Sequence, residues 1–160
     1  MKNDDLLYAA ATNLTAAKTS LTFDHVMTKL SVKVTKLGTE VDQNLTVKEV
    51  KIIGLATTAD FNPQTGVLTT GTDFTGTTIA YNSTNNLYDA LVFPAEYETL
   101  QVIITLSDDS VFTTIVTCID GLAGGTHYTI TLQVGQDAVN LATVSADSWE
   151  STSGGDLATD

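Results

Sequence analysis

LTFDHVMTKLSVKV, residues 21–34, alternates between apolar and polar side chains in its second half. From Leu30 onward an apolar residue fills every second position, which is typical of a β-strand with one buried face. In the first half Leu21 and Phe23 alternate on odd-numbered positions, so the phase shifts by one residue. His25 lies at this shift, where one extra residue indicates a β-bulge that bends a strand. We therefore interpret His25 as a packing residue at a bend, held by backbone groups, rather than as a ligand or a catalyst.

The composition of the chain also favours β-strands. Its 160 residues fit one domain that is large enough to bury a core. Hydrophobic residues make up 42%, which indicates a globular rather than a disordered chain. Thr occurs 29 times, and Thr, like Val and Ile, fits a pleated sheet better than a helix. The predicted fold class is all-β.

Charge is distributed unevenly along the chain. All seven basic residues are Lys and lie between Lys2 and Lys51, whereas residues 52–160 carry 13 carboxylates and no side-chain cation. With a net charge of -12, such a surface repels phosphate backbones and anionic membranes. We therefore expect no nucleic acid as a partner, and the charge suits an extracellular setting. No apolar run approaches the roughly 20 residues of a membrane span, so we also expect no direct membrane span.

The sequence shows no motif for a cofactor, a metal ion or a catalytic centre. A phosphate-binding loop, a dinucleotide fingerprint, zinc-ligand spacing and an EF-hand loop are all missing from it. Cys118 is the single cysteine and lies in an apolar run, which indicates a small buried hydrophobe. An enzyme would need His25 or His127 within hydrogen-bonding distance of a carboxylate and a hydroxyl. We interpret His127 as a solvent-facing strand residue and expect neither an enzyme nor a cofactor.

The middle of the chain gives weaker signals. The apolar spacing in residues 45–56 also fits a helix, but their β-branched content and Gly54 favour a strand. Residues 57–87 are irregular, and the NPQTG within them predicts a turn that Gly66 closes. We expect short hairpins here, and their expected apolar anchors are Val67, Leu68, Ile79 and Tyr81.

The second half of the chain alternates more clearly. Pro94 is expected to end one strand or to lie at a sheet edge. Residues 100–106 alternate strictly, and SDDS then turns the chain into a returning strand over residues 112–119. Residues 126–134 alternate again, and a GQD turn leads to a further apolar stretch. Several strands at this spacing, each with one apolar face, predict two sheets packed face to face.

Three segments carry a family resemblance in their order and spacing. LTFDHVMTKLSVKV places an apolar residue, Phe and His before Lys-Leu and an alternating strand. LYDALVFPAEYETLQVIITL places Pro before an alternating strand. GGTHYTITLQVGQDAVNLATVSADSW joins Gly and Tyr to an alternating strand, a turn, a short strand and Trp. The motif residues are Phe23, His25, Leu30, Pro94, Gly125, Tyr128 and Trp149. In these features the chain resembles the C-terminal portion of the fimbrillin-like family of bacterial type V surface pilins.

The resemblance implies a transthyretin-like, Greek-key antiparallel β-sandwich. It further implies a structural subunit or accessory component of a surface fimbria with a role in cell adhesion. Such subunits are exported and assemble when one donates a β-strand to the open sheet of its neighbour. The implied partners are other pilin subunits, and the implied location is the fimbrium at the outer membrane. The chain itself shows no export signal.

We expect three regions in the chain. Residues 1–20 would be an N-terminal segment or a junction with an upstream domain, residues 21–149 the β-sandwich and residues 150–160 a flexible acidic tail. The alternative function is a carbohydrate- or host-protein-binding module of a surface lipoprotein, with exposed aromatic residues beside Asp or Asn. The aromatic residues that could stack on sugars are Phe74, Tyr81, Tyr88 and Tyr97.

Overall fold

The structure, a computed structural model, contains no helix in the residues that it describes and hence none that could cross a membrane. The described residues are 5–10, 22–36, 45–84, 86–118, 120–135, 138–149 and 152–153. Most of the expected N-terminal segment and of the expected tail lies outside them. The strands are β1 (Leu7–Tyr8), β2 (Thr22–His25), β3 (Thr28–Lys36), β4 (Val47–Leu55), β5 (Ala59–Asn62), β6 (Val67–Thr70), β7 (Gly76–Ile79), β8 (Tyr81–Thr84), β9 (Leu87–Val92), β10 (Thr99–Leu106), β11 (Val111–Thr117), β12 (Thr126–Val134), β13 (Val139–Ser148) and β14 (Thr152–Ser153).

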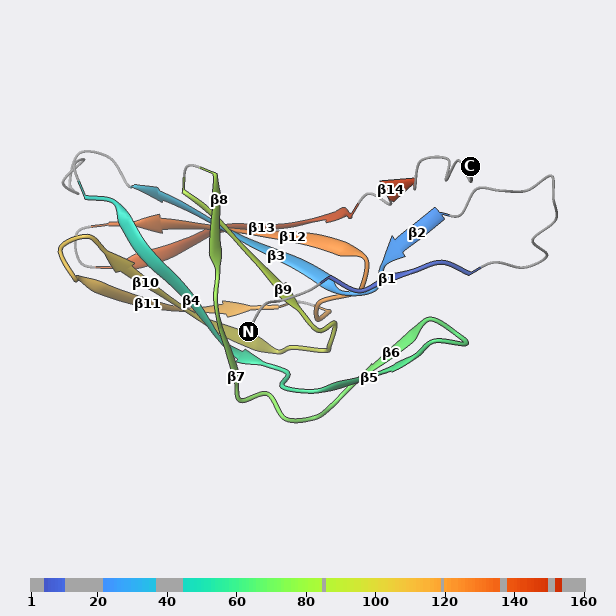
Figure 1. Ribbon diagram of the computed structural model, residues 1–160. Helices are drawn as coiled ribbons and strands as arrows, with labels where there is room; N and C mark the ends of the chain where they lie inside the picture. Colours follow the sequence, from blue (N-terminus) through green and yellow to red (C-terminus); the bar gives the residue numbers. More distant parts are fainter. Residues whose placement is uncertain are drawn as a thin grey trace.

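Two sheets form a β-sandwich, as the alternation predicted (Figure 1). One sheet has the strand order β13-β12-β3-β9-β8, and the other has the order β11-β10-β4-β7. The chain passes from one sheet to the other between β3 and β4, between β7 and β8, between β9 and β10, and again between β11 and β12. These crossings give the sandwich its Greek-key character. Neighbouring strands run antiparallel, except that β12 pairs with β3 in parallel.

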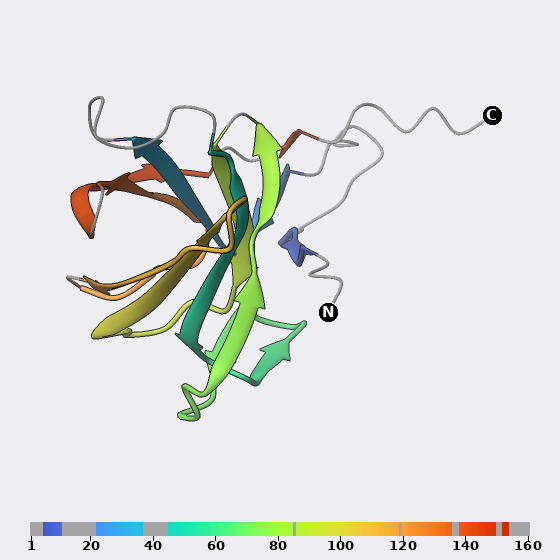
Figure 2. The ribbon, with the colours of Figure 1, turned by 90° about the vertical axis from the view of Figure 1, so that its left-hand side faces the viewer.

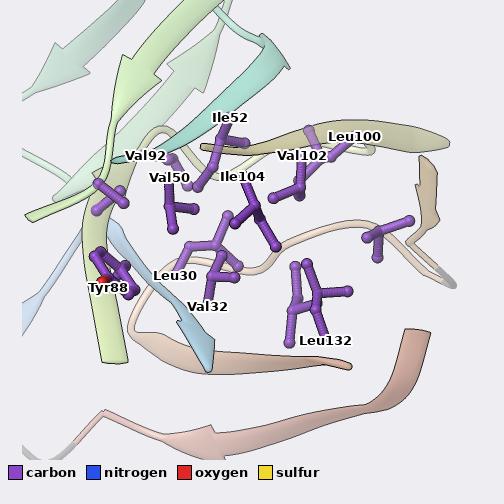
Figure 3. Close-up of a cluster of buried hydrophobic side chains, with 14 of the residues drawn as sticks. Leu30, Val32, Val50, Ile52, Tyr88, Val92, Leu100, Val102, Ile104 and Leu132 are labelled. Carbon is purple, nitrogen blue, oxygen red and sulfur yellow. The ribbon is translucent and has the colours of Figure 1, made fainter. Parts of the chain in front are cut away.

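The core lies between the facing sides of the two sheets. Figure 3 shows Leu30 and Val32 of one sheet close to Val50 and Ile104 of the other. Alternate residues are buried here from Leu30 to Val34 in β3, from Leu100 to Leu106 in β10 and from Ile130 to Val134 in β12, because successive side chains of a strand point to opposite faces. Cys118 packs against this core, and burial raises the pKa of its thiol. Cys118 is only half-buried, so the expected small buried hydrophobe is confirmed in its contact with the core but not in full burial.

One edge of the sandwich is closed by a strand that changes sheets. β7 belongs to the four-stranded sheet and β8 to the five-stranded sheet, and only Ala80 separates them (Figure 2). Ala80 is buried, and its N–H donates to the carbonyl of Val50 at 2.9 Å. Ile79 and Tyr81 flank it and are both exposed. The expectation that they anchor hairpins in the core is therefore wrong, because the strand buries Ala80 instead.

The β5–β6 hairpin projects beyond the sandwich (Figure 1). Its turn is the predicted NPQTG, in which the N–H of Gly66 donates to the carbonyl of Asn62 at 2.8 Å. Of its two expected anchors, Leu68 is half-buried but Val67 is exposed. The strand expected over residues 45–56 is confirmed as β4.

The phase shift at His25 marks a break between two strands. β2 ends at His25, a bend follows at Met27, and β3 begins at Thr28. β2 lies in a separate sheet of order β1-β2-β14, so the two strands never share a ladder. The expected β-bulge is thus corrected: the chain leaves one small sheet and enters the sandwich.

Candidate functional site

His25 joins three distant parts of the chain at one end of the sandwich. Its imidazole lies parallel to the indole of Trp149, with ring centroids 3.7 Å apart and 4° between the planes. Its Nδ1 lies 2.6 Å from Oδ2 of Asp5. The expected backbone partner is therefore replaced by a carboxylate and an aromatic ring. We name this arrangement the His25–Trp149 stack. Its geometry supports packing as the role of His25.

The loop before β12 is hydrogen-bonded to the backbone of Trp149, the second member of the stack. The N–H of Trp149 donates to the carbonyl of Gly125 at 3.0 Å, and the N–H of Gly125 donates to the carbonyl of Met27 at 2.9 Å. Gly125 has a φ of 66°, a conformation that L-residues rarely adopt. The hydroxyl of Tyr128 accepts a hydrogen bond from the N–H of Ala123 at 3.1 Å and so fixes the same loop.

The remaining motif residues are not members of the stack itself. Phe23 pairs with Thr152 across β2 and β14. Leu30 is fully buried in the core. The carbonyl of Pro94 accepts a hydrogen bond from the hydroxyl of Thr70, and Pro94 follows the end of β9, as predicted. Sequence reasoning missed Asp5, since nothing local connects this carboxylate to a histidine twenty residues later.

Two clefts flank the N-terminal segment at this end of the molecule. The first has a volume of about 750 Å³ and includes Tyr8, Phe74 and Asp24 in its lining. The second, of about 480 Å³, is lined mainly by apolar residues such as Met27 and Phe61. Within the described ranges, no three His, Cys, Asp or Glu side chains are grouped so that they could hold a metal ion.

Ser31, His127 and Asp89 form a hydrogen-bonded network on the outer face of the five-stranded sheet. Oγ of Ser31 donates to Oδ1 of Asp89 at 2.5 Å and lies 2.7 Å from Nε2 of His127. Because the serine proton goes to Asp89, Nε2 of His127 is the donor to Ser31. His127 was predicted to face solvent from the Thr face of β12. It lies on that face, but its side chain is partly buried and contacts Ser31.

This network contains the residue types of a catalytic triad in the wrong order. In a triad the histidine lies between the serine and the carboxylate and accepts the serine proton. Here the serine lies in the middle and donates to the carboxylate. Ser31 is also fully buried, so no substrate can reach its hydroxyl. The geometry supports a structural role for these three side chains.

Electrostatics fix the protonation states in the network. Burial disfavours the charged Asp89 carboxylate, but hydrogen bonds from Ser31 and Ser83 and the ammonium of Lys29 together lower its pKa. Burial, with a smaller contribution from Lys29, lowers the pKa of His127, whereas Asp89 and Asp147 oppose this shift. At neutral pH the imidazole is therefore neutral and the carboxylate ionised.

The depressed pKa of His127 predicts a loss of stability in mild acid. In the unfolded chain His127 takes up a proton near its ordinary pKa of about 6.5, before the folded chain does. The free energy of unfolding should therefore fall as the pH drops below about 6.5. We expect urea denaturation at decreasing pH to show a smaller fall for His127→Gln, which keeps a donor for Ser31, than for the wild type. Identical pH dependence of the two proteins would contradict this account.

β13 forms an open edge of the five-stranded sheet. Among the described strands it pairs with β12 alone, and most of its ten residues are exposed. Leu141 and Val144 are 42% and 47% exposed although they lie opposite the buried Leu132 and Ile130. Since paired residues share a face of the sheet, the core face continues onto β13 without a full cover. A register shift next to Leu132 keeps both residues on this face.

Comparisons with known proteins agree with the fold. The sequence profile of the family described as fimbrillin-like matches residues 1–149. No curated protein sequence matches the chain. A solved structure from Bacteroides uniformis, described as a "putative cell adhesion protein", has a TM-score of 0.71 at 20% identity over 81% of this chain and 53% of that one.

Two further solved structures show the same likeness. One from Bacteroides ovatus, with the same description, has a TM-score of 0.65 at 18% identity and covers 81% of this chain and 48% of that one. The tip fimbrial protein Mfa3 from Porphyromonas gingivalis has a TM-score of 0.54 at 10% identity and covers 79% of this chain and 52% of that one. At these identities the likeness shows a shared fold. The chain spans about half the length of the three structures.

Proposed function

Because the chain belongs to the fimbrillin-like family, whose profile spans residues 1–149, we propose that it is a structural subunit or accessory component of a bacterial surface fimbria. The sandwich fold, which it shares with a tip fimbrial protein, supports this role. We place the protein at the cell surface, in a fimbrium at the outer membrane. Its proposed partners are other subunits of the fimbria, and we propose no catalytic role.

The open edge at β13 is the observation that supports a mechanism of assembly. An edge strand offers a row of backbone N–H and C=O groups that another strand can pair with. Leu141 and Val144 add apolar side chains that an incoming strand would cover. β11, the edge strand of the other sheet, lies next to β13, so an added strand would also fill the space between the sheets. We therefore propose that subunits assemble by donating a strand to this edge.

Lysine at the proposed edge is expected to abolish assembly. A Leu141→Lys, Val144→Lys variant should remain monomeric at concentrations where the wild type associates, because a charged edge strand resists pairing. Both side chains are already partly exposed, so the melting temperature should change little. Light scattering over a range of protein concentrations measures the association.

The matched control is Val67→Lys on the projecting hairpin. Val67 is 55% exposed and lies on a two-stranded hairpin outside both sheets of the sandwich, so this variant should associate like the wild type. If the edge variant and the control associate equally, the contact between subunits lies elsewhere and the proposed edge is wrong.

A further inference from the structure

The outer face of the five-stranded sheet carries two neighbouring cross-strand rows of side chains. In one row Tyr81 lies opposite Asp89, and Asp89 lies opposite Ser31. Oδ2 of Asp89 lies 3.3 Å from Nζ of Lys29, which belongs to the neighbouring row. Directly opposite residues of a sheet point to the same side, as do residues two apart on one strand. Lys29 lies two residues before Ser31, so Tyr81, Asp89 and Lys29 all face outward. An aromatic ring thus stands beside an ion pair on an open surface.

A cleft lies over this part of the sheet. Its volume is about 340 Å³, which is at the lower end of small-ligand sites. Lys29 and Asp89 lie in its lining together with two aromatic residues, Tyr81 and Trp149. Tyr81 is 77% exposed, whereas Trp149 is held by the His25–Trp149 stack. The other lining residues are Ile79, Ala90 and Leu91.

These side chains have the chemistry that recognises a sugar. A pyranose ring has an apolar C–H face, which packs against an aromatic ring, and a rim of hydroxyls. An ionised carboxylate has about four acceptor positions, and Asp89 already accepts from Ser31, Ser83 and Lys29, so it can accept from one sugar hydroxyl as well. Lys29 is a donor with three N–H groups and can reach a second hydroxyl.

We propose that this cleft binds one neutral pyranose ring of a glycan. Tyr81 and Trp149 pack against the ring, and Lys29 and Asp89 hydrogen-bond to its hydroxyls. The ring is neutral because Lys29 is already paired with Asp89 and the net charge of -12 repels anionic sugars.

The other aromatic residues considered for sugar stacking fit this role less well. Tyr88 and Tyr97 are buried, and their hydroxyls are hydrogen-bonded to backbone groups. Phe74 is partly exposed but packs edge-on against Tyr97 in the cleft beside the N-terminal segment. Tyr81 is thus the candidate that stands beside a carboxylate on an open sheet face.

Tryptophan fluorescence tests this site directly, because Trp149 is the single tryptophan of the chain. We would titrate the full chain with lactose, cellobiose, N,N′-diacetylchitobiose and mannobiose up to about 20 mM. At least one of these neutral sugars is expected to give a saturable change in the emission of Trp149. No saturable change with any of them would overturn the proposal, as would preferential binding of sialic acid or glucuronic acid.

Two variants separate the proposed cleft from other surfaces. Tyr81→Ala removes an exposed ring and should weaken binding about tenfold. Phe74→Ala removes a partly exposed ring in another cleft and should leave the affinity unchanged. Circular dichroism confirms that both variants fold. Equal affinities of the wild type and Tyr81→Ala would place the sugar elsewhere and refute the assignment.

Discussion

A Leu30→Ala variant is expected to lose about 3 to 4 kcal/mol of its free energy of unfolding. Leu30 is fully buried on β3, the central strand of the five-stranded sheet, and faces Val50 of the other sheet (Figure 3). Alanine would leave a cavity that two packed sheets cannot close. Domains of this size are stable by about 5 to 15 kcal/mol, so the loss is a large share. Urea denaturation measures it.

The control for this variant is Ile115→Ala. Ile115 is 65% exposed on β11, so a truncation of the same size should cost less than about 0.5 kcal/mol. Equal losses in the two variants would mean that the core does not lie between the sheets where the structure has it.

A Gly125→Val variant is expected to cost about 3 kcal/mol. The φ of 66° strains a β-branched residue, and a Cβ atom at this position would lie 3.0 Å from the carbonyl oxygen of His25. Relief of this contact would move the loop that binds the N–H of Trp149. We therefore expect a changed emission of Trp149 in addition to the lower stability.

Asn86→Val separates strain from crowding. Asn86 has a φ of 62°, so valine there is strained to a similar degree, but the residue is exposed in a turn. We expect this change to cost about 1 to 2 kcal/mol and to leave the emission of Trp149 unaltered. If both variants cost the same, the close approach of Gly125 to His25 has no energetic importance.

The sequence predicted the strands well wherever one face is buried. In β3, β10 and β12 the apolar residues recur with the period of two that a half-buried strand requires. Prediction was wrong at the edge that β7 and β8 close, where Ile79 and Tyr81 are exposed and the small Ala80 is buried. Hydrophobicity alone could not show this, because the strand lies at the rim of both sheets.

The contacts between distant segments could not be predicted from the sequence. Alternation indicates which face of a strand is buried but not which strand lies beside it. The parallel pairing of β12 with β3 brings His127 to Ser31, which lies 96 residues away in the chain. In the same way His25 was predicted to be a packing residue, but its partners Asp5 and Trp149 follow from the tertiary fold. The candidate sites consist of such long-range contacts.

The proposal of strand donation at β13 is tested most directly by hydrogen exchange with and without an added peptide that spans residues 138–160. This peptide carries the alternating apolar residues of β13 and can act as a strand from a second subunit. We predict that it binds, that the backbone amides of β13 become protected and that the melting temperature rises. Unchanged exchange throughout β13 at saturating peptide, with an unchanged melting temperature, would contradict assembly through this edge.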